Sequence, residues 1–542
     1  MSVRRVMGIE TEFGITSTQV DGRGTPLSPM LLSAQVVRAY SAGSAPGDAL
    51  PASAGWDYAD ETPLRDARGF EMARALADRS QLTDVEDPAI ANTVLSNGAR
   101  FYVDHAHPEY SAPEVTSPLA AVRWDRAGEL VARRAVETLA ADGREVRLYK
   151  NNVDGKGASY GTHENYLVPR TVPFDRLTRL LIPFLVARPV FAGAGRVGLG
   201  QASETSGFQI SQRADYLEAE VGLETTLRRP IVNTRDEPHA TPHLHRRLHV
   251  IVGDATMADV TTYLAMGSLS LVLRVIETHP ELLEGLTLAR PVPSVQVISH
   301  DPTLRAAVPL ADGRELTGLD LVEAHLQAVQ QARDLALASG DERWAEEPTP
   351  MTPTTGSTTD TLSEAQAAPL RATDDVLARW RQVVDALRRD PAEAAGQVEW
   401  VAKHHLLQRF RDRAGVGWDD PRLAAMDIQW HDLDPARGLA QKLRAAGHLE
   451  RLLGEDEVAA AVTEPPADTR AWFRGECVRR YGPHGDLQGA SWDSVTLLDE
   501  RRRARRVRMD EPTSGGRDQV QPLLARHTRT ATLLQDLASE DA

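Results

Sequence analysis

Residues 5–18 read Arg-Val-Met-Gly-Ile-Glu-Thr-Glu-Phe-Gly-Ile-Thr-Ser-Thr, and this stretch sets the character of the fold. Its apolar and polar side chains alternate, which predicts a β-strand with one buried face. Glu10 and Glu12 are two residues apart, so a strand places both carboxylates on the same face. An edge strand that turns its acidic side chains to solvent gives the same pattern, so two interpretations stay open: a solvated edge or a ligand site.

Other segments carry strand and helix signals. The turn signal Asn97-Gly98 precedes a strand-like run at 99–104, and similar runs occupy 146–151, 159–168 and 491–498. Helical spacing of apolar residues is found at 118–139, 175–186, 258–277 and 374–412, with shorter helix candidates near Glu455 and Thr469.

The chain has 542 residues, too many for one core, because single cores stop growing near roughly 250 to 300 residues. We expect a large domain at 1–425 and a small C-terminal domain at 426–542. The stretch 41–64 is rich in Ala, Gly, Ser, Pro and Asp and predicts a long exposed loop. The Ser/Thr/Pro-rich stretch 346–368 predicts a low-complexity insertion.

Composition excludes several classes of protein. The single cysteine, Cys477, rules out an intramolecular disulfide and a thiolate zinc cage. A net charge of -16 argues against a general nucleic-acid binder. The N-terminus has no apolar stretch typical of a signal peptide, and the longest apolar run, at 180–187, is too short to span a membrane. We therefore expect a cytoplasmic protein that binds neither nucleic acid nor membranes.

Oxygen and nitrogen donors suggest metal chemistry. Glu10, Glu12 and Glu109 are the carboxylates that Mg²⁺ prefers, and His163 and His249 could join them or could be ordinary buried histidines. No Walker-type phosphate loop and no Gly-x-Ser-x-Gly motif is present.

Asp104 ends an apolar strand, where a carboxylate can attack an amide carbonyl or take a proton from water, if an arginine stabilises the oxyanion. Arg100, Arg229 and Arg235 are candidate donors. A solvated carboxylate at a strand end is the plainer interpretation of Asp104.

Longer motifs resemble a known family. Their segments are Met7–Gly14, Asn97–Asp104, His107–Tyr110, Lys150–Asn152, Tyr160–Tyr166, Asn233–His239 and Arg246–Asp254. Together they are similar to the Pup ligase and deamidase family, whose fold resembles glutamine synthetase and the carboxylate-amine ligases. The resemblance implies an α+β fold, with an antiparallel sheet cradling ATP, helices on its outer face and a small C-terminal domain.

The resemblance also implies roles for matching positions. Asp104 matches the essential catalytic aspartate, Arg229 and Arg235 are candidates to bind the Pup glutamate, and Trp492 resembles a tryptophan that contacts the nucleotide. The implied magnesium ligands are Glu10, Tyr102, Glu109, His163 and His249. The implied ATP contacts are Gly8, Ile9, Glu10, Thr11, Glu12, Ser111, Ala112, Asn165 and Arg247.

Two branches of the family differ in reaction, since one ligates the acidic modifier Pup to lysines and the other deamidates Pup and removes it from proteins. The His105-Ala106 spacer and an insertion at about 41–82 resemble the deamidase branch. That branch implies hydrolysis with ATP and Mg²⁺ bound as cofactors and with Asp104 as nucleophile or general base. The implied partners are Pup, pupylated proteins and a proteasomal ATPase. An ATP-consuming ligase and a non-enzymatic Pup-binding module are the rivals.

The arginine run from Arg501 to Arg508 has three readings: a solvated helix face, a surface for acidic Pup, or a nucleic-acid contact, which the net charge disfavours.

Overall fold

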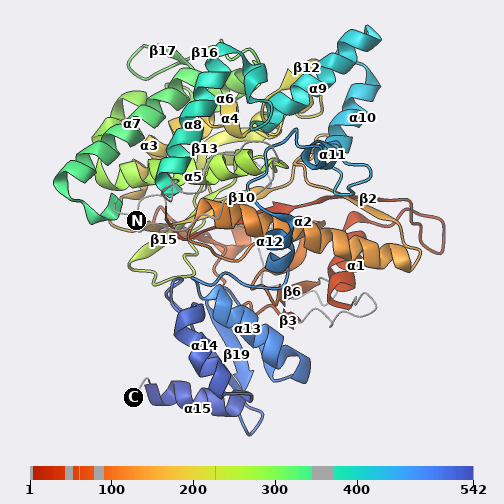
Figure 1. Cartoon of the computed structure of the whole chain (residues 1–542), viewed down its shortest axis with the longest axis vertical. Helices are drawn as coiled ribbons and strands as arrows, with labels where there is room; N and C mark the ends of the chain where they lie inside the picture. Colours follow the sequence, from red (N-terminus) through yellow and green to blue (C-terminus); the bar gives the residue numbers. More distant parts are fainter. Residues whose placement is uncertain are drawn as a thin grey trace, which may run out of the picture.

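A computed structural model of the protein describes residues 4–42, 53–59, 61–77, 91–225, 228–344 and 372–540. The predicted insertion at 346–368 lies outside these residues, as do 43–52, 60 and 78–82 of the predicted loop at 41–82. The described chain has an α+β architecture, with a large sheet in the middle, helices over one side and a separate C-terminal group of elements (Figure 1).

The central sheet has nine strands, and all its neighbouring strands are antiparallel except β13 and β14. The predicted antiparallel sheet is therefore mixed at one edge. In spatial order the strands are β13 (Leu217–Gly222), β14 (Arg229–Asn233), β15 (His245–Val250), β10 (Thr162–Pro169), β1 (Met7–Glu12), β8 (His107–Ser111), β7 (Arg100–Asp104), β6 (Asn92–Leu95) and β3 (Ser53–Gly55).

The alternating stretch at the N-terminus is β1, which lies fifth in this order. Its central position rules out the interpretation of Glu10 and Glu12 as residues of a solvated edge strand. Glu10 lies opposite His163 of β10, and Glu12 lies opposite Glu109 of β8. Chemistry-bearing residues from distant parts of the sequence therefore meet on one face of the sheet.

Helices cover the other face and the surroundings of the sheet. They begin where the sequence offers caps: the Ser117 side chain accepts a hydrogen bond from Ala120 N at the start of α2, and Thr317 with Asp320 forms a capping box at α7. The helices are α1 (Pro29–Ala42), α2 (Pro118–Ala141), α3 (Phe174–Ala187), α4 (Pro189–Ala192), α5 (Asp259–Thr278), α6 (Pro291–Ser299), α7 (Gly318–Ser339), α8 (Ala372–Arg389), α9 (Glu399–Ala414), α10 (Pro421–Trp430), α11 (Leu439–Ala445) and α12 (Glu455–Ala461).

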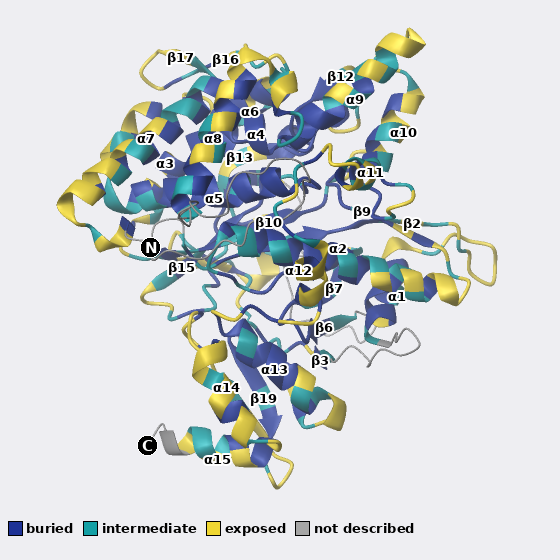
Figure 2. Cartoon of the chain, viewed as in Figure 1, coloured by how far each residue is buried: buried dark blue, intermediate teal, exposed yellow. Residues whose placement is uncertain are grey.

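Helix α5 is long and apolar enough to cross a membrane, but 94% of its most apolar 18-residue stretch is buried within the protein. Figure 2 shows it among dark, buried elements, while the outer helices such as α7 have exposed faces. We identify α5 as a core helix. Small two-stranded sheets complete this part: β2 (Gly14–Ser17) with β9 (Val146–Tyr149), β11 (Arg196–Leu199) with β12 (Thr205–Gln209), β16 (Ala307–Pro309) with β17 (Glu315–Thr317), and β4 (Arg65–Asp66) with β5 (Phe70–Glu71).

The C-terminal elements have their own buried cluster. They are α13 (Ala471–Tyr481), β18 (Leu487–Ala490), β19 (Ser494–Leu498), β20 (Ala504–Arg508), α14 (Arg517–Arg526) and α15 (Thr530–Glu540). The larger core extends through α12 to Val462, and the second cluster combines residues from Phe473 onward with Ala54, Trp56 and Val94. The domain boundary at residue 426 stays a prediction.

The described part of the predicted loop at 41–82 has more structure than its composition indicates. Residues Ser53–Gly55 are an edge strand of the central sheet, and Trp56 is buried in the C-terminal cluster. The expectation of an exposed loop is wrong for these residues. Their strand forms through pairing with β6, a partner that local composition does not reveal.

The arginine run is likewise not a helix. Residues Ala504–Arg508 form β20, which pairs with β19 along its whole length. Several of its arginines have acidic partners, such as Arg503 with Asp499 at 3.0 Å and Arg506 with Asp57 at 3.3 Å. The helix-face reading is wrong, and the reading as a surface for acidic Pup stays a prediction.

Candidate active site

The first of two donor clusters joins β1, β10 and β15. Ligand atoms of Glu10, His163 and His249 lie within 4.8 Å of one another. Asn165 Nδ2 donates to Glu10 Oε1 at 2.9 Å, and the guanidinium of Arg247 lies 3.7 Å from the same oxygen. Three of the predicted metal ligands thus form one compact group, and two predicted ATP contacts lie against it.

The second cluster holds the predicted catalytic residue. Ligand atoms of Glu12, Asp104 and Glu109 lie within 4.8 Å of one another. Tyr102 lies opposite Glu109 in the sheet register. Glu12 therefore lies with Glu109, as its grouping among the candidate Mg²⁺ carboxylates predicts, and its implied contact with ATP stays a prediction. Glu109 Oε2 is buried and has no hydrogen-bond partner among the described residues, as expected of a metal ligand.

The pKa values of two carboxyl groups in the second cluster, Asp104 and Glu109, are shifted in opposite directions. Burial opposes ionisation of Asp104, but the adjacent His105 outweighs it and lowers the pKa of Asp104 to about 2. Burial, followed by the charges of Asp104, Glu12 and Glu10, raises the pKa of Glu109 well above its usual value. Crowded carboxylates of this kind need positive charge before all of them can ionise.

The imidazoles are suited to bind a metal. Burial and then Arg247 lower the pKa of His249 well below its usual value, so its ring is neutral, the form that coordinates metals. The rings of His163 and His249 meet edge to face, with centroids 4.9 Å apart.

Predicted substrate arginines flank the clusters differently. Burial would lower the pKa of Arg235, but the charges of Glu237, Glu61 and Asp104 raise it. Its Nε lies 3.4 Å from Glu237 Oε2. Arg229 donates to Thr225 O at 2.9 Å and to Ser159 O at 2.5 Å. Backbone carbonyls therefore hold Arg229 and a carboxylate holds Arg235, and the substrate role of both stays a prediction.

Next to the first cluster lies a cavity with about 550 Å³ of empty space. Predicted residues on its wall are Gly8, Ile9, Glu10, Ala112, Asn165, Arg247 and Trp492. Thr11, Glu12 and Ser111 are not on this wall; Thr11 Oγ1 instead donates to Asp125 Oδ1 on the helical side of the sheet at 3.3 Å. The sequence did not single out His239, Glu114 and Arg470, which also line it.

The C-terminal elements close one wall of this cavity through buried ion pairs. Glu114 lies three residues after β8 and forms an ion pair with Arg470, which also lines the cavity, at 2.7 Å. Its carboxylate also accepts a hydrogen bond from Arg474 Nη1 at 3.1 Å. Arg474 also donates to Trp492 O at 2.6 Å and to Gly98 O at 2.9 Å. One carboxylate therefore fixes α13 and the Trp492 backbone against the sheet.

These pairs predict a pH-dependent stability. Burial opposes ionisation of Glu114, but Arg474 and Arg470 outweigh it and lower its pKa from 4.5 to about 2. A depressed pKa contributes stability that is present above pH 4.5 and lost as the pH falls toward 2, here on the order of 3 kcal/mol. We expect Glu114→Gln to be less stable than wild type in urea unfolding at pH 7, with the difference shrinking steadily below pH 4.5. A difference in stability that stays constant down to about pH 3 would contradict this role of Glu114.

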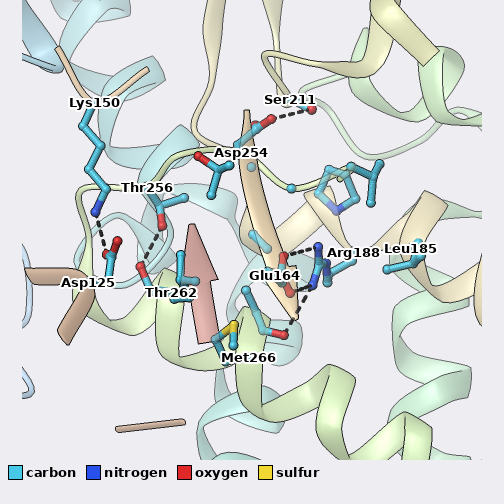
Figure 3. A pocket seen from close by; sticks show the side chains of 18 residues that line it. Asp125, Lys150, Glu164, Leu185, Arg188, Ser211, Asp254, Thr256, Thr262 and Met266 are labelled. Carbon is cyan, nitrogen blue, oxygen red and sulfur yellow. Dashed lines mark hydrogen bonds and ion pairs between the residues drawn. The ribbon is translucent and has the colours of Figure 1, made fainter. Parts of the chain in front are cut away.

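The back face of the same strands meets the helices. A second cavity lies between the sheet and the helices (Figure 3). Two ion pairs line it: Arg188 Nη2 with Glu164 Oε1 at 2.7 Å, and Lys150 Nζ with Asp125 Oδ2 at 2.6 Å. Asp254 also lines it and accepts hydrogen bonds from Ser211 Oγ and from the backbone N–H groups of Ala194 and Gln212. The ion pairs join β10 and the residue after β9 to the helices.

Arg213 is a buried arginine that the sequence did not reveal. It is 1% exposed, and its Nε and Nη1 have no hydrogen-bond partner in the described part of the chain. Burial and then the charge of Arg229 lower its pKa to about 9, while Glu12 and Asp254 act in the opposite direction. It lies in the turn after β12, where no periodic pattern marks it. Cys477, by contrast, is buried in the C-terminal cluster, and burial raises the pKa of its thiol.

The turn after Asp104 is also unusual. His105 and Ala106 both have left-handed backbone, with φ of 48° and 99°. Non-glycine residues rarely adopt this conformation, and it persists at functional sites when the surroundings hold it. Here His105 Nδ1 lies 2.7 Å from Asp104 Oδ2, and Ser33 Oγ donates to Ala106 O at 2.8 Å. The turn thus orients the Asp104 carboxylate.

Comparisons with known proteins agree with this geometry. A model of the Pup-ligase protein family matches residues 5–496. The chain is 47% identical to the depupylase of Acidothermus cellulolyticus, covering 98% of both chains, and 46% identical to the Pup deamidase/depupylase of Mycobacterium tuberculosis, covering 99% of this chain and 100% of the other. It is 37% identical to a Pup–protein ligase of Acidimicrobium ferrooxidans, covering 96% of this chain and 98% of the ligase.

Solved structures give the same picture. The ligase PafA in its complex with Pup matches with a TM-score of 0.73 and 30% identity, covering 99% of this chain and 95% of that one. PafA in complex with ADP matches with a TM-score of 0.67 and 32% identity, covering 80% of this chain and 89% of that one.

Proposed function

The chain belongs to the Pup ligase family, and on that premise we propose that it hydrolyses carboxamide bonds at the C-terminal side chain of Pup. It deamidates the terminal glutamine to glutamate and cleaves the isopeptide bond between Pup and substrate lysines. The observation that carries this choice is the identity gap: relatives named for deamidation or depupylation are 46–47% identical, and the ligase is 37% identical. Pup and pupylated proteins are its partners, and we place the reaction in the cytoplasm.

The residues fit ATP or ADP with Mg²⁺. Arg247 and Arg470 on the wall of the cavity beside β1 can neutralise phosphate charge, and Trp492 on the same wall offers an aromatic ring to a base. The two donor clusters, with the unpartnered Glu109 Oε2, supply the oxygen and imidazole ligands that Mg²⁺ requires. Glu10, Tyr102, Glu109, His163 and His249 are the proposed ligands, and Glu12 joins them. When bound, the cations neutralise the crowded carboxylates and polarise the reacting groups.

The protein residues then have defined tasks. Arg235 orients the Pup glutamyl group, and Arg213 faces the negative charge that develops on the amide oxygen. Asp104, held through Oδ2 by His105, attacks the carbonyl carbon or takes a proton from water. Both routes release ammonia from glutamine or the lysine amine from a conjugate, and neither needs ATP hydrolysis for each bond cleaved.

Two incubations test the function. Glutamine-ended Pup with ATP and Mg²⁺ should gain the mass that marks conversion of glutamine to glutamate, and a Pup–lysine conjugate should release both components. ADP release should stay far below the product formed. Stoichiometric ADP release with a new isopeptide bond would instead identify a ligase, and an unaltered Pup mass would leave only a Pup-binding role.

A further inference from the structure

Trp56 contacts both Trp492, on the wall of the proposed nucleotide cavity, and Arg100 of β7, the strand that ends at Asp104. Its ring packs edge to face on Trp492, with centroids 5.3 Å apart, and Trp492 lines the nucleotide cavity. On its other side the guanidinium of Arg100 lies 4.0 Å from the Trp56 ring. The residue is 8% exposed, so this contact is made largely out of water.

Arg100 is held between two aromatic rings. Its guanidinium lies 4.0 Å from the Trp56 ring and 3.9 Å from the Tyr102 ring. Its Nε donates to Asn92 Oδ1 at 3.0 Å. Because side chains alternate along a strand, Arg100, Tyr102 and Asp104 share one face of β7. The sandwich therefore fixes a permanent positive charge on the face that carries Asp104.

Other contacts hold Trp56 in this place. Trp56 Nε1 donates to Glu61 Oε1 at 2.6 Å, and the same oxygen lies 3.7 Å from Arg100 Nη1. The next residue, Asp57, donates its backbone N–H to Ala490 O at 2.9 Å. The segment that carries Trp56 is thus fastened both to the central sheet and to the C-terminal elements.

We propose that Trp56 is a positioning residue of the active site, which clamps Arg100 against Tyr102 so that the guanidinium keeps its place on the Asp104 face. Without the indole, the long arginine side chain is free to turn toward water, where its charge is better solvated. The role rests on the proposed hydrolase function, and it makes Trp56 and Glu61 part of the catalytic apparatus.

Kinetics on purified full-length variants test the clamp, with glutamine-ended Pup as substrate. Trp56→Leu keeps apolar bulk but loses the cation–π face, and Arg100→Lys keeps the charge but loses the planar stack. We expect each change to lower kcat about tenfold to a hundredfold with little change in KM for Pup, because a slightly displaced group loses most of its effect. Trp56→Phe should restore kcat to within about threefold of wild type, since it keeps an aromatic face.

A double variant distinguishes positioning from general damage. If Trp56 acts through Arg100, Trp56→Leu combined with Arg100→Lys should have the kcat of the poorer single variant. Trp418→Leu is the matched control, because it removes a similar Trp–Arg contact, with Arg411 at 4.4 Å, outside the lining of the nucleotide cavity and should keep wild-type kcat.

The outcomes are distinct. Unchanged kcat in Trp56→Leu, or additive losses in the double variant, would overturn the clamp. If Trp56→Leu does not fold, wild-type kcat in Arg100→Lys would overturn it equally well. An inactive wild type would instead show that the proposed function itself is wrong.

Discussion

Asp104→Asn should abolish both deamidation and depupylation while nucleotide binding persists. Asparagine has almost the same shape, so His105 can still bond to the side chain, but it can neither attack a carbonyl nor accept a proton. We expect kcat to fall by at least about a thousandfold. Deamidation is measured by mass spectrometry, depupylation by gel shift, and ATP affinity by calorimetry.

The variant should keep the fold at a modest cost in stability. Although burial opposes ionisation, His105 helps to lower the pKa of Asp104 from 3.8 to about 2, so the charged carboxylate stabilises the fold above pH 3.8 and asparagine loses that contribution. The melting temperature at neutral pH without Mg²⁺ should therefore be slightly lower than that of wild type. Asp142→Asn, at an exposed carboxylate paired with Arg144, is the control and should change none of these values. Substantial turnover by Asp104→Asn would refute the assignment of Asp104.

Oxygen labelling separates the two routes for Asp104. If it is a nucleophile, turnover in labelled water places the label in the Asp104 carboxylate, because water opens an anhydride. If it is a general base, the label appears only in the product.

Local patterns predicted the strand that carries the site but not its surroundings. The alternation of side chains along a strand predicts Glu10 and Glu12 on one face of the sheet, and the structure confirms this prediction. Which residue each one meets depends on strand register, which brings His163 to Glu10 and Glu109 to Glu12. That register comes from pairing between distant segments, so local patterns could not predict which residue lies opposite each glutamate.

Long-range packing also explains the remaining differences. Residues 53–56 have a loop-like composition, yet Trp56 gains a buried place between Arg100 and Trp492. The arginines at 501–508 become a strand because β19 offers a partner. Arg213 lies in a turn with no pattern at all, and only its burial without a partner reveals it.

Arg213→Met should change activity and stability in opposite directions. Two buried nitrogens of the Arg213 guanidinium, Nε and Nη1, have no hydrogen-bond partner among the described residues, which destabilises the fold, and methionine fills a similar volume without a charge. The melting temperature should therefore rise. If Arg213 faces the charge that develops on the amide oxygen, kcat should fall by about a hundredfold to a thousandfold, as when an oxyanion donor is removed.

A paired arginine provides the matched control. Arg196 is equally buried but lies 3.1 Å from Asp215 Oδ2, so Arg196→Met leaves a buried carboxylate with one partner fewer and should lower the melting temperature. Arg213→Lys keeps the charge, so it should recover part of the lost kcat while remaining no more stable than wild type. A lower melting temperature with unchanged kcat in Arg213→Met would mean that the side chain serves packing alone. A buried arginine that destabilises the fold is retained in a protein when the reaction needs its positive charge. Removing such an arginine should therefore raise the melting temperature and lower kcat.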